Sequence, residues 1–595
     1  MKNRTYADYL CDWLVEEGYT HCFFVAGGNT MHLLNSSRSR FKCVPVVHEV
    51  AAAIAVEYFN ETSPGNKAFA LVTAGPGITN AITGIAGAWL ESRELLIIGG
   101  QVKSSDLMTG GLRQRGIQEI DGVSLVAGVT KISRQLSSPI SEGDFKKTIR
   151  EGSSGKPGPV FLEICLDVQG ITDYVLPKEN TSTETHLDSI AVDESALERL
   201  TKLMQGSERP IILIGGGLNR EASTEFQEFF TNLGFPIMTT WNGIDRFPST
   251  HNLFWGRPNT WGQRSANVLI QQSDLIIAIG TRLGIQQTGF NWKGFAPLAK
   301  IVQVEIDKTE IDKKHPKIAI EFNCDAEDFL RSLAKLNLSI EHTQIAEWID
   351  FGTKVRHLLP NNEAANSRSA NHINPFDFVE QLSECLSSSD VVIPCSSGGA
   401  FTTMMQAFNQ KSGQKIVSDK GLASMGYGLS GAIGAAYANP NKRVVLVEGD
   451  GGFAQNLQEL GSAFVSGAAL KIFIYSNNGY ASIRMTQRNY FDGAYVGCDI
   501  STGLGLPDWV KLFEAYGIET IEMTSNSFTD SKFLAALDDS SIRAFLVPID
   551  PEQTYFPKIT SKVLVNGQME SNPLHLMTPD LSDEIQLAVF KYLEV

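Results

Sequence analysis

Short apolar runs bounded by glycine alternate with longer segments in which apolar residues recur at helical spacing, and this alternation is repeated three times along the 595 residues. Uninterrupted apolar runs are typical of parallel strands that are buried on both faces, and the intervening segments are typical of the helices that cover them. The pattern therefore predicts an α/β protein with three doubly wound parallel-sheet domains.

Polar stretches separate the three predicted domains. The first domain is expected to span residues 1–178, and the second to span residues 190–345. A polar linker at 360–375 leads into the third domain, expected at 370–556, and a C-terminal tail of little strand character follows at 557–595. Each domain has the length of an ordinary globular domain.

The overall charge limits the classes of partner. Asp and Glu number 66 against 50 Lys and Arg, which gives a net charge of −16. A field of this sign repels nucleic acids and anionic membranes, so neither is an expected partner. The hydrophobic fraction of 43% is that of an ordinary globular protein and disfavours a disordered chain.

The cysteine pattern indicates reduced thiols. The eight cysteines are scattered and include no Cys-x-x-Cys pair, so we expect neither disulfides nor a thiolate metal site. The N-terminus has no apolar signal segment, and no apolar run approaches the roughly 18 residues of a membrane span. We therefore expect a cytoplasmic protein without a membrane partner.

The segment EGDGGFAQNLQEL carries the strongest local signal. The preceding apolar run predicts a strand that brings Asp450 to the carboxyl edge of a parallel sheet. Gly451 and Gly452 would let backbone N–H groups approach a ligand where the next helix begins, and a phosphate-bearing ligand suits such an edge. The alternative is that Asp450 belongs to an ordinary glycine-rich turn of an α/β fold.

A second strand, KIFIYS, ends just before Asn477, which lies 27 residues after Asp450. This spacing allows one helix and a return strand, so the two side chains are expected side by side. A carboxylate, an amide oxygen and a nearby backbone carbonyl are hard oxygen ligands, which suit Mg²⁺ shared with a diphosphate.

Taken together, these motifs resemble those of the thiamine diphosphate (ThDP) enzymes, whose motif is Gly-Asp-Gly followed, after some 25 to 30 residues, by an Asn pair. The resemblance implies that Asp450, Asn477 and the backbone oxygen of Gly479 bind Mg²⁺. The first Asn of the family's pair is replaced here by Ser476, but the family's ligand is the second Asn, which matches Asn477.

The stretch SDKGLASMGYGLSGAIGAA at 418–436 resembles the pyrimidine-binding loop of the same family. The resemblance gives Met425 the role of holding the cofactor in a bent shape. The alternative is that Met425 is an ordinary core residue at a helix start.

Glu49 is expected near the start of a largely apolar helix, where an unpaired buried carboxylate would be costly. A charge that complements the helix dipole is one explanation. The resemblance implies another, in which Glu49 hydrogen-bonds the aminopyrimidine ring of ThDP and so promotes removal of the thiazolium C2 proton. His48 is interpreted as structural.

The resemblance covers most of the chain and is closest to the acetolactate synthase branch. It places Gly28 in the family's Gly-Gly turn and Gln118, in RQRGIQEID, at the family's active-site Gln, so that both would line the reacting centre together with Glu49 and Met425. Further cofactor contacts would come from Ser397, Gly398, Ala423, Gly449, Gly451, Gly452 and Tyr480.

Two departures bear on the substrate. Where acetolactate synthases carry a Trp that shapes the acceptor pocket, this chain has Thr486, which predicts a wider or more polar acceptor site and weaker discrimination between small 2-oxo acids. The segment GGNTMHLL, residues 27–34, and the segment GRPNTWGQRSAN, residues 256–267, resemble carboligases of surface-polysaccharide synthesis, including the yersiniose-type enzymes.

The middle domain raises the question of a flavin. In the acetolactate synthase branch this domain holds FAD without using it for redox chemistry, and the corresponding contacts would fall on Gly216, Gly217, Arg282, Asp307 and Asp325. The family's RFDDR run is absent, since Leu283 and Gly284 follow Arg282. An empty nucleotide fold is therefore the alternative to structural FAD.

The function implied by the resemblance is a carboligase that depends on ThDP and Mg²⁺. It would decarboxylate a 2-oxo acid, with pyruvate as the expected donor, and transfer the two-carbon unit to a carbonyl acceptor such as a second 2-oxo acid, an aldehyde or ketone, or a keto-sugar nucleotide. A non-oxidative 2-oxo acid decarboxylase, a flavin-linked pyruvate oxidase and a catalytically silent nucleotide-binding or regulatory protein are the alternatives. The resemblance also implies a homodimer or homotetramer, because Glu49 of one subunit would reach a cofactor bound by the third domain of another.

Overall fold

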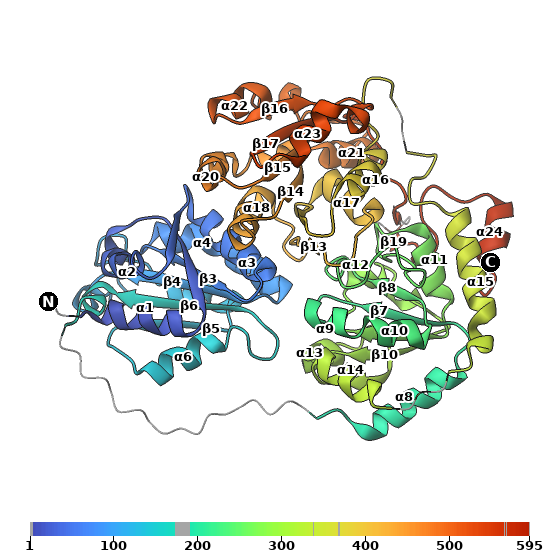
Figure 1. Ribbon diagram of the computed structural model, residues 1–595, viewed down its shortest axis with the longest axis horizontal. Coiled ribbons are helices and arrows are strands. Elements are labelled where there is room, and N and C mark those ends of the chain that lie inside the picture. Colours follow the sequence, from blue (N-terminus) through green and yellow to red (C-terminus); the bar gives the residue numbers. More distant parts are fainter. Residues whose placement is uncertain are drawn as a thin grey trace. The chain divides into compact units, whose positions relative to one another are not determined.

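The computed structural model describes residues 4–172, 191–336, 338, 340–366, 369–563, 566 and 568–593 (Figure 1). The described residues form two compact units. The first holds the N-terminal domain together with Ser389–Ala400 and Val417–Pro548, and the second holds the middle domain, Phe401–Ile416 and the C-terminal tail. The predicted boundaries at 178 and 190 lie outside the described residues.

The N-terminal domain contains a six-stranded parallel sheet in the order β2-β1-β3-β4-β6-β5. Its strands are β1 (Tyr19–Phe24), β2 (Lys42–Pro45), β3 (Lys67–Val72), β4 (Leu95–Gln101), β5 (Ile132–Leu136) and β6 (Pro159–Cys165). The helices are α1 (Tyr6–Glu16), α2 (Met31–Ser37), α3 (Glu49–Thr62), α4 (Pro76–Glu91), α5 (Gly122–Val126), α6 (Glu142–Arg150) and α7 (Leu166–Gln169). Strands β3, β4 and β6 are almost wholly buried, as their uninterrupted apolar runs predict.

The middle domain contains a five-stranded parallel sheet in the order β11-β10-β9-β7-β8. Its strands are β7 (Pro210–Ile214), β8 (Ile237–Thr239), β9 (Leu275–Ile279), β10 (Lys300–Val304) and β11 (Ile318–Phe322). The helices are α8 (Glu194–Gly206), α9 (Arg220–Glu225), α10 (Gln227–Leu233), α11 (Arg264–Gln272), α12 (Ile285–Thr288), α13 (Lys308–Asp312), α14 (Ala326–Ala334) and α15 (His342–Leu358).

The third sheet includes the parallel order β12-β14-β15-β17-β16. These strands are β12 (Val391–Ile393), β14 (Val444–Gly449), β15 (Leu470–Ser476), β16 (Glu519–Glu522) and β17 (Arg543–Pro548), and the short β13 is Lys415–Ile416. The helices are α17 (Gly398–Ala407), α18 (Tyr427–Ala438), α19 (Asp450–Phe453), α20 (Leu460–Ser466), α21 (Ala481–Tyr490), α22 (Trp509–Ala515) and α23 (Ser531–Asp538). The expectation of three parallel-sheet α/β domains is confirmed.

Within the first unit, the N-terminal and C-terminal domains share one hydrophobic core. Helix α3 packs against α18; both are rich in alanine, and α18 also contains three glycines. At Gly434, a Cβ atom would overlap the backbone of Ala55, so glycine lets the two helix backbones approach closely. This packing fixes the start of α3 relative to the loop before α18.

Two further helices and a short sheet complete the described fold. Helix α16 (Pro375–Cys385) belongs to the second compact unit. The tail has the two short antiparallel strands β18 (Ser561–Val563) and β19 (Met569–Ser571), followed by α24 (Asp583–Val589).

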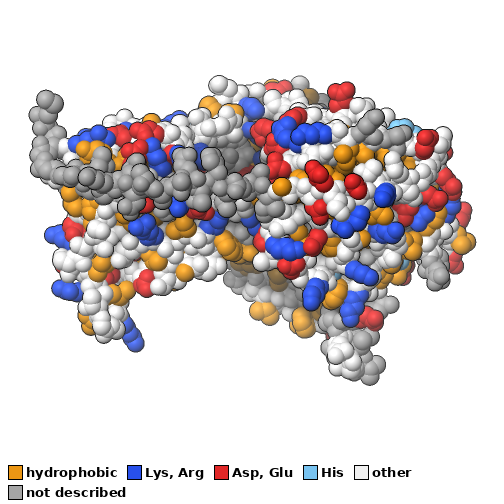
Figure 2. Space-filling model, turned by 90° about the horizontal axis from the view of Figure 1, so that it is seen from below, with side chains coloured by type: hydrophobic (Ala, Val, Ile, Leu, Met, Phe, Trp, Pro, Cys, Tyr) orange, Lys and Arg blue, Asp and Glu red, His pale blue; other side chains and the backbone are white. Residues whose placement is uncertain are grey.

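On the face shown in Figure 2, acidic and basic side chains are interspersed.

Candidate active site

Asp450 lies where β14 ends and α19 begins, as the sequence pattern predicts. The residue is 1% exposed. Its carboxylate accepts hydrogen bonds from the backbone N–H groups of Gly451 at 2.7 Å, Asn477 at 3.0 Å and Gly479 at 3.2 Å. Burial raises the pKa of Asp450 to about 6, although these N–H donors lower it. A bound cation would favour the ionised form.

Asn477 follows β15, which is the direct neighbour of β14 in the sheet, with Gly449 opposite Tyr475. The side-chain amide of Asn477 lies 3.1 Å from both the Gly479 carbonyl oxygen and Asp450 Oδ1. In this orientation its nitrogen donates to both atoms. Rotating the amide by 180° would put its oxygen at the same position, beside the other two oxygens. Adjacent ligands of octahedral Mg²⁺, each about 2.1 Å from the metal, are about 3 Å apart, so the rotated amide would give three oxygens with the spacing that this ion needs.

Two residues that sequence reasoning missed hold the turn at Asn477. Arg484 is buried and donates to the carbonyl oxygens of Asn477 at 3.4 Å and Asn478 at 3.2 Å, and to Asp499 at 3.1 Å. Asn478 has a φ of 63°, a left-handed conformation that asparagine tolerates better than most residues. Arg484 therefore stabilises a strained turn whose carbonyl and amide oxygens form the cluster.

Glycine is required by close packing at one of the predicted cofactor contacts. A Cβ atom on Gly451 would lie 2.5 Å from the ring of Tyr480, whereas nothing lies within 4 Å of such an atom on Gly449 or Gly398. Gly398 is the first residue of α17, directly after Ser397, and this segment follows β12, the direct neighbour of β14 in the sheet. Ser397 and Gly398 therefore lie at the same carboxyl edge of the sheet as Asp450.

Met425 lies in the loop of residues 418–426, which we call the wedge loop, and its side chain is 37% exposed. Gln455 Nε2 lies 3.7 Å from the Met425 sulfur, and Asn456 donates to the Gly426 carbonyl oxygen at 2.8 Å. Ala423 has a left-handed φ of 56°. The chain that follows Asp450 thus contacts the loop that carries Met425.

Glu49 is the first residue of α3 and is 7% exposed. Asn80 donates to Glu49 Oε2 at 2.9 Å, so the buried carboxylate has a partner. His48 caps the helix by accepting from the N–H of Val50, in agreement with a structural role.

Glu459 holds the turn before Glu49, a role that sequence reasoning did not find. It is fully buried and accepts from the N–H groups of Val47 at 3.1 Å and His48 at 3.0 Å. Ser462 donates to its other oxygen at 2.7 Å. This acceptor role depends on tertiary packing between residues 411 positions apart, which no local sequence signal reveals.

Gly28 and Gln118 occupy exposed turns of the N-terminal domain. Nothing lies within 4 Å of a Cβ atom built on Gly28, so the chain itself does not require glycine there. Gln118 has a left-handed φ of 62°, and its backbone lies directly over Gly75 in the TAGPG turn. Its neighbour Glu119 is buried and accepts from the N–H groups of Arg115 and Gly116, each at 2.8 Å.

The predicted flavin contacts follow the carboxyl ends of strands in the middle sheet. Several of them are already engaged within the domain: Gly217 N–H donates to the Gly280 carbonyl oxygen at 2.9 Å, and Asp307 and Asp325 cap α13 and α14. Buried Arg246 also donates to the Gly216 carbonyl oxygen at 3.3 Å. The edge is suitable in topology, but its polar groups fit a flavin only in part.

Among the described residues, no group of three or more His, Cys, Asp or Glu side chains could hold a metal ion. No helix within the same residues is long and apolar enough to cross a membrane.

The chain matches three family models in succession. Residues 4–125 match the N-terminal binding domain of thiamine pyrophosphate enzymes, residues 197–333 match their central domain, and residues 397–546 match their C-terminal binding domain. The chain therefore belongs to the thiamine pyrophosphate enzyme family, thiamine pyrophosphate being another name for ThDP.

Relatives among known proteins place the chain in the acetolactate synthase-like branch of that family. It is 30% identical over 518 residues to a probable acetolactate synthase large subunit of Methanocaldococcus jannaschii, covering 85% of each chain. It is 28% identical to the acetolactate synthase large subunit of Buchnera aphidicola from Acyrthosiphon pisum, covering 93% of this chain and 96% of the relative. With isozyme 1 of Escherichia coli K12 the identity is 25%, over 94% of this chain and 96% of the relative. The chain is a ThDP-dependent enzyme.

Proposed function

We propose that this enzyme is a Mg²⁺-dependent carboligase that uses pyruvate as donor and transfers a two-carbon unit to a carbonyl acceptor. The observation that carries the proposal is that the Asn477 side-chain amide lies 3.1 Å from both Asp450 Oδ1 and the Gly479 carbonyl oxygen, so that a rotated amide would complete a set of three oxygen ligands. The similarity to acetolactate synthase large subunits supports pyruvate as the donor.

When bound, ThDP would supply a carbon nucleophile and accept the electron pair released as CO₂ leaves the 2-oxo acid. Asp450, Asn477 and Gly479 would hold the Mg²⁺ that binds its diphosphate, and Met425 would support its bent shape. Asn80 donates a hydrogen bond to one carboxylate oxygen of Glu49, and this bond fixes the orientation of the carboxyl group. The other oxygen can then hold or move a proton at the aminopyrimidine.

We further propose that the working enzyme is a homodimer or a homotetramer in which Glu49 acts on the cofactor bound by a partner chain. Strongly exposed apolar side chains of the first compact unit support self-association: Ile117 is 88% exposed, Val465 and Ile500 are each 78% exposed, and Val496 is 73% exposed. Analytical ultracentrifugation of the holoenzyme tests this proposal, and a monomer that is fully active would contradict it.

The acceptor is proposed to be bulkier or more polar than pyruvate, such as a keto-sugar nucleotide or an aldehyde. Thr486 lies exposed on α21, where its hydroxyl donates to the Ser482 carbonyl oxygen at 3.0 Å. A threonine turned back onto its own helix covers less space than an indole, which favours a wide acceptor site.

The test is to incubate the purified enzyme with ThDP, Mg²⁺ and pyruvate, with and without candidate keto-sugars and aldehydes, and to identify the products. A new carbon–carbon bond to the added acceptor is the expected result, and acetolactate alone would indicate a biosynthetic acetolactate synthase. Free acetaldehyde as the sole product would indicate a decarboxylase, and consumption of O₂ an oxidase. Glu49→Gln should bind ThDP but lose turnover.

We propose that FAD binds the middle domain as a structural ligand, at the sheet edge formed by the turns after β7, β9, β10 and β11. The topology of that edge supports the proposal, and the engagement of Asp307 and Asp325 as helix caps weakens it. The visible absorption of the purified protein tests it directly. A colourless protein that gains no flavin on incubation with FAD would contradict the proposal.

A further inference from the structure

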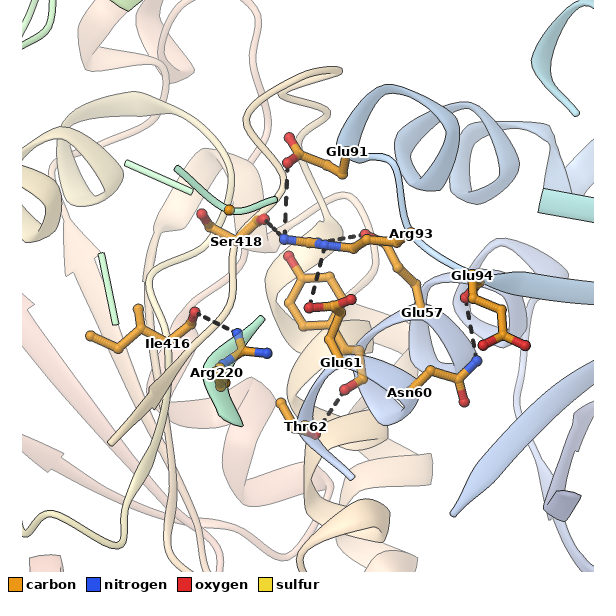
Figure 3. A network of polar contacts seen from close by, with 12 residues as sticks. Glu57, Asn60, Glu61, Thr62, Glu91, Arg93, Glu94, Arg220, Ile416 and Ser418 are labelled. Atoms are coloured by element: carbon orange, nitrogen blue, oxygen red, sulfur yellow. Dashed lines mark hydrogen bonds and ion pairs between the residues drawn. The ribbon is translucent and has the colours of Figure 1, made fainter. Parts of the chain in front are cut away.

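A buried ionic cluster joins the N-terminal domain to the wedge loop. Arg93 lies at the turn between α4 and β4, and its guanidinium donates to Glu57 of α3 at 2.6 Å. Its other terminal nitrogen donates to the Ser418 carbonyl oxygen at 2.8 Å. Figure 3 shows the guanidinium between Glu91 and Glu57, with the Ser418 carbonyl oxygen beside it.

Glu91, the last residue of α4, continues this contact along the loop. One oxygen of its buried carboxylate accepts from the N–H of Lys420 at 2.7 Å and from the N–H of Gly421. The N-terminal domain therefore forms hydrogen bonds with three backbone groups of the loop: the carbonyl group of Ser418 and the N–H groups of Lys420 and Gly421. These are charge-assisted hydrogen bonds, which are stronger than bonds between neutral groups.

The rest of the loop backbone is held from within the C-terminal domain. Asp419 Oδ1 accepts from the N–H groups of Leu422 and Ala423, each at 3.1 Å. The Ser396 hydroxyl donates to the Ser424 carbonyl oxygen, and Asn456 holds Gly426. With its backbone held on both sides of position 425, the loop presents the half-exposed Met425 side chain on a rigid support.

We propose that Glu91 and Arg93 of the N-terminal domain are positioning residues for the cofactor, because they hold the wedge loop so that Met425 supports the bent shape of ThDP. This inference rests on the role proposed above for Met425. Neither residue need touch the cofactor, and both act through the backbone of the loop.

The burial of the cluster makes this support hard to replace. Glu57 and Asp419 are fully buried, and Tyr427 donates to Glu57 at 3.4 Å from the first turn of α18. Burial raises the pKa values of Glu57, Glu91 and Asp419. Because these carboxyl groups and one guanidinium are packed together, removing a single member leaves its neighbours without compensation.

The test compares Glu91→Ala with Glu91→Gln, which keeps a side-chain oxygen that can accept from both N–H groups. Three properties of the full-length protein are measured: the affinity for ThDP with Mg²⁺, the affinity for inorganic pyrophosphate with Mg²⁺, and the rate at which the C2 proton of bound ThDP exchanges for deuterium. The matched control is Glu94→Ala, since Glu94 lies three residues away and pairs with Lys67 at 2.9 Å within the N-terminal domain.

The expected result is that Glu91→Ala weakens ThDP binding and slows C2 exchange by about tenfold or more, with pyrophosphate affinity unchanged. Glu91→Gln should restore most of both properties, and Glu94→Ala should resemble the wild type. Should Glu91→Ala fail to fold, Arg93→Lys serves instead, because lysine keeps a cation near Glu57 but lacks a second nitrogen for the Ser418 carbonyl. It should shift the same two properties in the same direction.

Two outcomes would overturn the inference while leaving the proposed function intact. In one, Glu91→Ala binds ThDP and exchanges the C2 proton like the wild type. In the other, ThDP and pyrophosphate affinities fall in parallel, which indicates general damage to the fold. A wild-type protein that exchanges no C2 proton would instead refute the proposed function, and the inference with it.

Discussion

Glu459 supports the turn before Glu49, and replacing it should loosen that turn specifically. Glu459→Ala removes the acceptor of two consecutive backbone N–H groups, those of Val47 and His48. Each hydrogen bond to a charged group contributes about 1.5–3 kcal/mol, so the two bonds together contribute about 3–6 kcal/mol, and water at the half-exposed turn replaces part of this contribution. We therefore expect a local loss of about 2–3 kcal/mol in the free energy of opening.

Hydrogen–deuterium exchange of the peptide that contains Val47 and His48 measures this local opening. A loss of about 2–3 kcal/mol corresponds to exchange that is roughly 30- to 150-fold faster. Turnover should fall as well, because Glu49 follows directly in the chain. Glu459→Gln, which keeps one oxygen for both N–H groups, should remain near the wild type.

Ser462→Ala is the matched control, since it removes the third hydrogen bond to Glu459 and leaves the two backbone bonds in place. It should change neither the exchange of the peptide nor turnover by more than a few-fold. The reasoning is refuted if Glu459→Ala leaves exchange of the peptide unchanged, or if Glu459→Gln accelerates exchange as much as Glu459→Ala.

Three further predictions follow from the described contacts. Burial raises the pKa of Glu57 from 4.5 to about 8, so its stabilising contribution is fully present below pH 4.5 and is lost as the pH rises towards 8. The free energy of unfolding should therefore fall over this range by at most about 1.4 kcal/mol per pH unit per proton, and Glu57→Gln should reduce this fall. If the free energy of unfolding of Glu57→Gln depends on pH as steeply as that of the wild type, the raised pKa of Glu57 is refuted. The charged and titratable groups that face Glu57 are Arg93, Glu91, Asp419, Tyr58 and Tyr427. Asp450→Ala should weaken Mg²⁺-dependent ThDP binding by about a hundredfold or more in calorimetric titration, and retained Mg²⁺ dependence would contradict the metal site. Thr486→Trp should shift product ratios towards small acceptors by roughly tenfold, as measured in competition between pyruvate and a larger aldehyde, and an unchanged ratio would exclude Thr486 from the acceptor site.

The parts of the structure that the sequence predicted follow from local periodicity and from the geometry of parallel sheets. The apolar runs that end at Asp450 and before Asn477 predicted two strands, and β14 and β15 are direct neighbours. The carboxyl ends of neighbouring parallel strands meet at one edge, so the clustering of Asp450 with Asn477 could be inferred before any coordinates.

Other roles could not be predicted, because they depend on contacts between distant segments. Arg93 reaches Ser418 across 325 residues, and no spacing rule relates these positions. Asp307 and Asp325 illustrate the opposite case. An aspartate directly before a helix is a common N-cap, so their capping of α13 and α14 could be inferred from the local sequence, while their predicted contact with a flavin stays a prediction.

Glu91 and Glu459 hold two functional segments by the same physical means. Each is a buried carboxylate that accepts from two consecutive backbone N–H groups of a segment in the other domain of the first unit. Backbone N–H groups that lose water must find another acceptor, and a carboxylate provides one while leaving the segment's own side chains unconstrained. The wedge loop can therefore be rigid in its backbone while Met425 stays exposed, and the turn before α3 can be rigid while Glu49 keeps an oxygen for chemistry. Replacing either carboxylate with a shorter side chain should thus affect the position of Met425 or Glu49 before it affects the proposed metal site at Asp450.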